Sequence, residues 1–135
     1  MLKLIIGKKG SGKTKTLITM VNEALAMTKG DVVCIEKGDK LKFDIKYQCR
    51  LIDTNEYCIN DGQALYGFIA GILASNHDVT DLFIDSALKI CENDTENFEI
   101  FLKQLENLLK TNTINCTITS SLDVENATET VKKYL

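Results

Sequence analysis

Eight consecutive residues near the start of the chain, from Gly7 to Thr14, have the pattern G-x-x-x-x-G-K-T. Glycines let a loop fold tightly enough for successive backbone N–H groups to point at one anion, and a following helix adds the positive end of its dipole. The Lys13 ammonium can then bridge the outer phosphates of a nucleotide, and the Thr14 hydroxyl can ligate Mg²⁺. The spacing therefore predicts a phosphate-binding loop.

A second candidate for this chemistry is the carboxylate of Asp85, which ends the apolar run Asp-Leu-Phe-Ile-Asp over 81–85. If this run is a buried strand, Asp85 lies at the carboxyl edge of the sheet and can hold Mg²⁺ through water. Asp81 begins the same run, so we expect it at the opposite edge as a cap. The expected metal-binding residues are therefore Thr14 and Asp85.

The elements that would position these residues alternate between short apolar runs and helical spacing. The apolar runs predict strands over 2–6, 32–36, 50–53, 81–85 and 114–119. Helices are expected over 13–28 and after a capping box formed by Asn60 and Gln63. Two more are expected to begin at Asp94 or Thr95 and at Asp123. Gly67 and Gly71, four residues apart on the second helix, predict close packing against a strand or a partner. The alternation predicts an α/β fold with a mostly parallel five-stranded sheet flanked by helices.

Residues 40–49 alternate strictly between apolar and polar types. The apolar positions are Leu41, Phe43, Ile45, Tyr47 and Cys49. A period of two residues is typical of a half-exposed strand, and a turn at 37–39 precedes it. We therefore predict an edge hairpin over 36–49.

Length and composition limit the number of domains and the classes of partner and site. The chain has 135 residues, enough for one domain over 1–135, and its net charge of −3 gives no basis for binding nucleic acid. Five cysteines at irregular spacings and a single histidine predict neither a zinc site nor a disulfide framework. No apolar stretch is long enough for a signal peptide or a membrane span, so we expect a cytoplasmic protein without membrane contact.

The chain resembles the P-loop NTPases through Gly7 to Thr14 and, less specifically, through Asp85. As a whole it is similar to short, stand-alone bacterial P-loop ATP-binding proteins with a RecA-like core. The resemblance implies a single three-layer P-loop domain with ATP and Mg²⁺ as cofactors. GTP is not expected, because the sequence contains no N-K-x-D motif.

One branch of this superfamily inserts a strand between the P-loop strand and the strand that carries the aspartate. The resemblance to this branch implies that strand 114–119 takes the inserted position; the alternative places the Asp85 strand directly beside the P-loop strand. At the end of the inserted strand, Ser120 or Ser121 would sense the γ-phosphate, unless these hydroxyls cap the last helix. The residues expected to bind nucleotide are Gly7, Lys8, Lys9, Gly10, Ser11, Gly12, Lys13, Thr14, Lys15 and Ser120.

Most enzymes of that branch carry a glutamate directly after the aspartate to polarise the attacking water, whereas Ser86 stands there in this chain. Glu36 and Asp53 end predicted strands and are the candidates for this base, with turn and cap roles as the alternative. The predicted catalytic residues are therefore Lys13, Glu36 and Asp53. The only arginine, Arg50, precedes its strand and should lie away from the nucleotide edge, so a guanidinium could come only from another subunit.

Together these features predict an ATP-binding protein with weak or partner-stimulated ATPase activity, as a homo-oligomer or with a protein partner. Two alternatives remain open at this point. One is a small-molecule phosphotransferase of the nucleoside or nucleotide kinase type. The other is a nucleotide-switched binding module without useful turnover.

Overall fold

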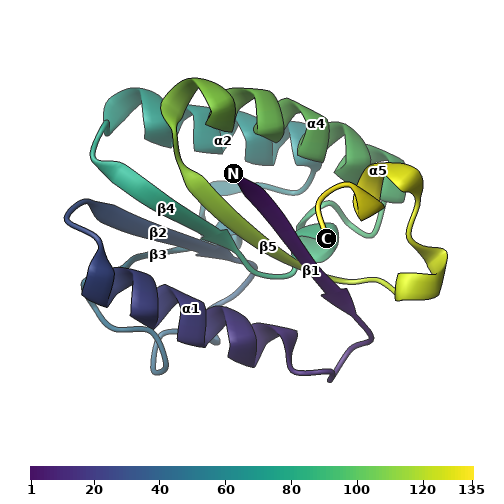
Figure 1. Cartoon of the computed structure of the whole chain (residues 1–135), viewed down its shortest axis with the longest axis horizontal. Coiled ribbons are helices and arrows are strands. Elements are labelled where there is room, and N and C mark those ends of the chain that lie inside the picture. Colours follow the sequence, from purple (N-terminus) through teal and green to yellow (C-terminus); the bar gives the residue numbers. More distant parts are fainter.

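Five strands form one sheet at the centre of the structure (Figure 1), a computed structural model that describes all residues from 1 to 135. The strands are β1 (Leu2–Gly7), β2 (Asp31–Glu36), β3 (Arg50–Asp53), β4 (Val79–Ile84) and β5 (Asn115–Ser121). Their order across the sheet is β1-β5-β4-β2-β3, and every neighbouring pair is parallel. All carboxyl ends therefore lie at the same edge of the sheet.

Helices cover both faces of the sheet and give the chain three layers (Figure 1). The helix α1 (Lys13–Met27) lies on one face, and α2 (Gly62–Ser75) and α4 (Thr95–Asn112) lie on the other. The shorter elements are 3₁₀ turns at Thr54–Tyr57 and Val124–Asn126, α3 (Ala87–Ile90) and α5 (Glu129–Lys132). The predicted α/β class with a five-stranded sheet flanked by helices is confirmed.

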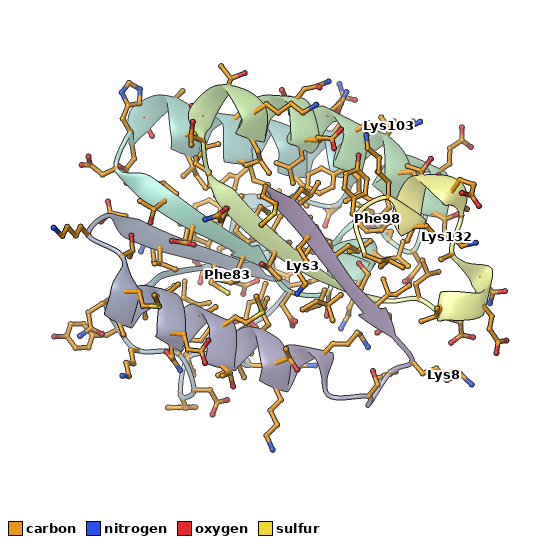
Figure 2. The ribbon with its side chains drawn as sticks, viewed as in Figure 1. Lys3, Lys8, Phe83, Phe98, Lys103 and Lys132 are labelled. Atoms are coloured by element: carbon orange, nitrogen blue, oxygen red, sulfur yellow. The ribbon has the colours of Figure 1, made fainter.

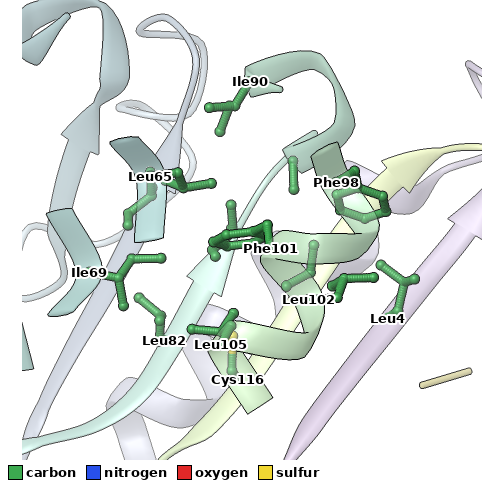
Figure 3. Packing of buried hydrophobic residues seen from close by; sticks show 14 of the residues in the cluster. Leu4, Leu65, Ile69, Leu82, Ile90, Phe98, Phe101, Leu102, Leu105 and Cys116 are labelled. Carbon is green, nitrogen blue, oxygen red and sulfur yellow. The ribbon is translucent and has the colours of Figure 1, made fainter. Parts of the chain in front are cut away.

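Most of the hydrophobic core lies on the side of the sheet covered by α2 and α4, where 26 buried residues form one cluster. Figure 3 shows Phe101 and Leu105 of α4 among Leu82 of β4 and Leu65 and Ile69 of α2. A second cluster of eight buried residues lies between the sheet and α1. Because both faces are covered, β2 and the second half of β4 are continuous apolar runs, over 32–35 and 82–84, which is why the sequence pattern located them.

The expected strand order is also observed, because β5 lies between β1 and β4. Gly7 at the end of β1 is paired with Ser121, and Ile84 at the end of β4 is paired with Ile118. The alternative order, with β4 beside β1, is not found. As a result, β5 contributes its own side chains between the Gly7–Thr14 loop and Asp85.

The predicted edge hairpin over 36–49 is wrong, because residues 37–49 form irregular turns and β3 is the edge strand beside β2. Leu41, Ile45 and Cys49 are buried, whereas Phe43 and Tyr47 are 88% and 91% exposed. The buried positions are thus four residues apart, not two. They pack in the same cluster as Leu17 and Val21 of α1, so tertiary packing selects turns where the alternation alone predicts a strand.

Two expectations for α2 also need correction. The N-cap of this helix is Asp61, which accepts a hydrogen bond from the Ala64 N–H at 2.7 Å, and not Asn60. Gly67 and Gly71 do not pack closely, since a Cβ added at either position would meet no atom within 4 Å. Both glycines lie on the exposed side of the helix. Their spacing therefore has no packing role within the chain.

Other element ends differ by a few residues. Asp81 lies inside β4, which begins at Val79, and not at the start of the strand. The last helix is limited to the four residues of α5, after the 3₁₀ turn at Val124–Asn126. Asp94 caps α4, as expected, by accepting from the Asn97 N–H at 3.0 Å.

The cysteines are free thiols, and all but Cys58 are buried. Burial raises the pKa of Cys49 to about 11 and that of Cys91 to about 12, so these thiols are protonated at neutral pH. None of the helices combines the length and the apolar character needed to cross a lipid bilayer.

Candidate functional site

A cleft of about 630 Å³ opens at the carboxyl edge of the sheet, between the β1–α1 loop and the segments that follow β2, β4 and β5. Only two of its 14 lining residues, Leu41 and Leu88, are hydrophobic. Five lysines line it, namely Lys9, Lys13, Lys15, Lys40 and Lys89, whereas Asp85 is its single carboxylate. The cleft thus has a local excess of four positive charges in a chain whose net charge is −3. Such a lining attracts anions.

The β1–α1 loop has the backbone geometry for which its glycines are required. Gly10 and Gly12 have φ of 86° and 90°, a region that side chains disfavour. A Cβ on Gly7 would lie 2.6 Å from Ser11 Oγ, so the loop folds back directly over this glycine. The Ser11 N–H closes the turn by donating to the Lys8 carbonyl at 3.1 Å.

The amino end of α1 points into this loop with unused hydrogen-bond donors. Gly12 is the N-cap in a left-handed conformation, and no side chain caps the helix. The N–H groups of Lys13, Thr14 and Lys15 have no acceptor within the chain. The same residues line the cleft, so the donors and the positive end of the helix dipole face the same space as the lysines.

The Lys13 side chain lies across the loop. Its ammonium donates to the Lys8 carbonyl at 2.9 Å and is 3.5 Å from Ser11 Oγ. These contacts hold the charge at the mouth of the cleft without neutralising it, because no carboxylate is among its partners. Lys8 itself is not a lining residue, and Figure 2 shows its side chain extending outward from the loop.

Asp85 is surrounded by hydroxyl groups at the end of β4. Its Oδ1 accepts from Thr119 Oγ1 at 2.8 Å and from Thr14 Oγ1 at 3.1 Å, and Ser86 Oγ lies 3.4 Å from Oδ2. Asp85 as a whole is only 9% exposed. Thr14 and Asp85, the two residues predicted to bind metal, are therefore brought into direct contact from positions 71 residues apart.

This pair fits the way in which Mg²⁺ is bound beside phosphates. A hydroxyl has one proton and two lone pairs, so Thr14 can donate to Asp85 and still offer an oxygen to a cation. The chain contains no group of three or more His, Cys, Asp or Glu side chains that could hold a metal ion. A cation held here would thus need ligands from phosphate and water, which is the usual situation for Mg²⁺.

The two candidate bases are both engaged in structural hydrogen bonds. Glu36 is 3% exposed, and its two oxygens accept from the N–H groups of Lys40 and Leu41 at 3.0 and 3.2 Å. Burial raises the pKa of this carboxyl group, although the two N–H donors act in the opposite direction. Asp53 Oδ1 accepts from the N–H groups of Gly38 and Asn55 at 2.8 and 2.9 Å. Neither residue lines the cleft.

The serines at the end of β5 have different environments. Ser120 is fully buried, and its Oγ accepts from the Leu88 N–H at 3.3 Å, so it supports α3 and does not line the cleft. Ser121 lines the cleft instead. The structure thus separates Ser120, which was predicted to bind nucleotide, from its alternative Ser121. The alternation of side chains along β5 is the physical reason.

The predicted residues that line the cleft are Lys9, Gly10, Gly12, Lys13, Thr14, Lys15 and Asp85. Those that do not line it are Gly7, Lys8, Ser11, Glu36, Asp53 and Ser120. Sequence reasoning missed Lys40, Lys89 and Thr119. The side-chain alternation of β5 could have indicated Thr119, but no sequence signal places Lys40 or Lys89 at this edge.

Compared with models of known protein families and with curated proteins, the sequence gives no match.

Proposed function

We propose that the chain is a P-loop nucleotide-binding domain that binds Mg-ATP in the cleft and hydrolyses it slowly, or only when stimulated by a partner. The observation that carries the proposal is that the unused N–H donors of residues 13–15 lie in the lining of a cleft with five lysines and one carboxylate. Donors of this kind at a helix start bind phosphate groups, and the lysines extend the favourable field along a polyanion.

In this proposal the chain grips the phosphates mainly with its backbone. The N–H groups of Lys13, Thr14 and Lys15 donate to phosphate oxygens, and the Lys13 ammonium exchanges its bond to the Lys8 carbonyl for a phosphate oxygen. The exchange replaces a neutral acceptor by a charged one, and hydrogen bonds to charged groups are roughly twice as strong. The tight loop around Gly7 keeps the donors in place before the nucleotide arrives.

Thr14 and Asp85 would hold Mg²⁺, with Thr14 as a direct ligand and Asp85 through water. When bound, the ion neutralises charge that develops on the phosphoryl oxygens. Thr119 fixes the Asp85 carboxylate through the 2.8 Å hydrogen bond, so the acceptor geometry is set by the sheet and not by the metal.

Slow turnover follows from the missing base. Asp85 is the only carboxylate in the cleft, and its oxygens accept from surrounding hydroxyls. Glu36 and Asp53 are held by backbone N–H groups of the loop that follows β2. A water molecule next to the terminal phosphate thus has no free carboxylate to take its proton. The same observation favours a nucleotide-switched binding module as the second candidate function.

The proposal is tested by thermal unfolding of the full chain with and without Mg-ATP. A ligand at one hundred times its Kd stabilises the folded state by about 2.7 kcal/mol, which for a chain of this size raises Tm by about 10 °C. We expect this shift in the wild type and less than half of it in Lys13→Ala.

The matched control is Lys103→Ala, which removes an exposed lysine on α4, on the other side of the sheet from α1 (Figure 2). We expect it to keep the full shift. Equal shifts in Lys13→Ala and Lys103→Ala, or no shift in the wild type, would refute nucleotide binding at this loop. Phosphate release measured on the same samples then separates slow hydrolysis from a switch without turnover.

A further inference from the structure

The segment after β2 is a fixed wall of the cleft. Glu36, the last residue of β2, accepts from the N–H groups of Lys40 and Leu41 at 3.0 and 3.2 Å. Asp53, the last residue of β3, accepts from the Gly38 N–H at 2.8 Å. Two strand-end carboxylates thus hold residues 38–41 through their backbone N–H groups.

The same segment is anchored to α1 beyond residue 41. Leu41 is 3% exposed and packs in the cluster that contains Leu17, one turn into α1. Asn22 of α1 donates to the Asp44 carbonyl at 3.0 Å and accepts from the Lys46 N–H at 3.2 Å. Because α1 begins at the nucleotide-binding loop, this packing fixes the distance between that loop and the segment 38–41.

Lys40 is the cation that this wall presents to the cleft. It is one of the two lining lysines that lie outside the Gly7–Thr14 motif and the residue after it, the other being Lys89. Its side chain forms no ion pair within the chain. The only arginine cannot replace it, because Arg50 begins β3 at the opposite edge and lines a separate hollow of about 440 Å³.

The position of the segment 38–41 after β2 determines which part of a bound nucleotide Lys40 can contact. β2 is the neighbour of β4, and the Asp85 N–H donates to the Ile35 carbonyl at 2.8 Å. The segment 38–41 therefore closes the cleft on the Asp85 side, and the two strands β5 and β4 separate β2 from β1, which ends at Gly7. A phosphate chain that enters at the β1–α1 loop and reaches the metal site approaches Lys40 with its terminal group.

We propose that Lys40 binds the terminal phosphate of the nucleoside triphosphate and that Glu36 is its positioning residue, so that the segment 38–41 distinguishes ATP from ADP. This inference rests on the proposed function, because it assumes that a nucleotide enters the cleft. Glu36 acts through the backbone of Lys40 and does not touch the nucleotide. In this inference Glu36 positions Lys40 and does not serve as a base.

The test is the affinity of the full chain for Mg-ATP and Mg-ADP, measured by calorimetry for matched variants. Loss of one charge-assisted hydrogen bond corresponds to about a tenfold loss of affinity. We expect Lys40→Ala to weaken Mg-ATP about tenfold and Mg-ADP less than about twofold, and Lys40→Arg to restore most of the ATP preference. Lys46→Ala, which removes an exposed lysine outside the cleft in the same β2–β3 connection, should change neither affinity.

Glu36→Gln tests the positioning role, because an amide offers one oxygen where the carboxylate offers two. We expect it to lower the affinity for Mg-ATP about threefold to fivefold and to leave the affinity for Mg-ADP unchanged. In the double variant with Lys40→Ala, it should cause no further loss of ATP affinity. A purely structural role would lower both affinities and would add to the effect of Lys40→Ala. If Glu36→Gln does not fold, the Lys40 variants still decide the identity of the phosphate contact.

Two results would overturn the inference while leaving the proposed function intact. One is that the wild type binds Mg-ATP and Lys40→Ala has the same ratio of ATP affinity to ADP affinity. The other is that Lys89→Ala loses the preference for ATP over ADP while Lys40→Ala keeps it. Absence of nucleotide binding in the wild type overturns the inference together with the proposed function.

Discussion

Thr119→Val is the most informative single change outside the loop, because Thr119 connects two strands through one buried hydroxyl. Its Oγ1 donates to Asp85 Oδ1 at 2.8 Å and accepts from the Ser86 N–H at 2.8 Å, and the residue is 1% exposed. Valine keeps the shape and removes both bonds. A hydrogen bond to a charged group contributes about 1.5–3 kcal/mol, and the bond from the Ser86 N–H, which is only partly buried beside the cleft, contributes about 0.5–1.5 kcal/mol more. We expect a loss of about 2–4 kcal/mol in the free energy of unfolding.

The chain offers a matched control for this prediction in Thr117→Val. Thr117 lies two residues earlier on the same face of β5, is 7% exposed and forms no side-chain hydrogen bond. Both variants replace a hydroxyl by a methyl group, so the difference between them isolates the contacts of Thr119. With a urea m-value of about 1–3 kcal/mol/M, the unfolding midpoint of Thr119→Val should lie about 1–2 M below that of Thr117→Val. Midpoints within about 0.3 M of each other would refute the proposed importance of the Thr119 bridge.

Two further predictions concern stability. Gly67→Ala and Gly71→Ala should each raise the free energy of unfolding by about 0.5–1 kcal/mol, because both glycines lie in the exposed interior of a helix and an added Cβ would meet no atom within 4 Å. A loss of stability of either variant in urea unfolding would contradict this open environment. Burial raises the pKa of Glu36 in the folded state, so its contribution to stability is greatest below the ordinary pKa of a glutamate and falls as the pH rises through the raised value. The Tm of Glu36→Gln relative to wild type should therefore increase from pH 4 to pH 7, and a constant difference would contradict a raised pKa.

The prediction of the fold from the sequence succeeded where the signal was local. Short apolar runs located β1, β2 and β4, and β2 is buried along most of its length because helices cover both faces of the sheet. The same logic was wrong for residues 40–49, where buried Leu41 and Ile45 alternate with exposed Phe43. That alternation is compatible with a period of two or of four, and only packing against α1 distinguishes the two.

The candidate site shows the same division between local and distant information. The pattern from Gly7 to Thr14 is contiguous, and its glycine conformations and unused N–H groups follow from the local backbone. Asp85 was located because it ends an apolar run, and it directly follows β4 in the structure. Glu36 was correctly placed at a strand end, but the role of its carboxylate depended on where residues 38–41 fold, which no local pattern records.

The sequence by itself determined the tight glycine loop, the helix that follows it and the buried strands, because each depends on backbone freedom and apolar spacing within a few residues. The tertiary structure decided that Thr119 supports Asp85, that Ser121 and not Ser120 lines the cleft, and that Lys40 and Lys89 add their charge to it. The physical reason is that a parallel sheet brings the carboxyl ends of distant strands to one edge. Which side chains meet there depends on strand order and on the path of the loops.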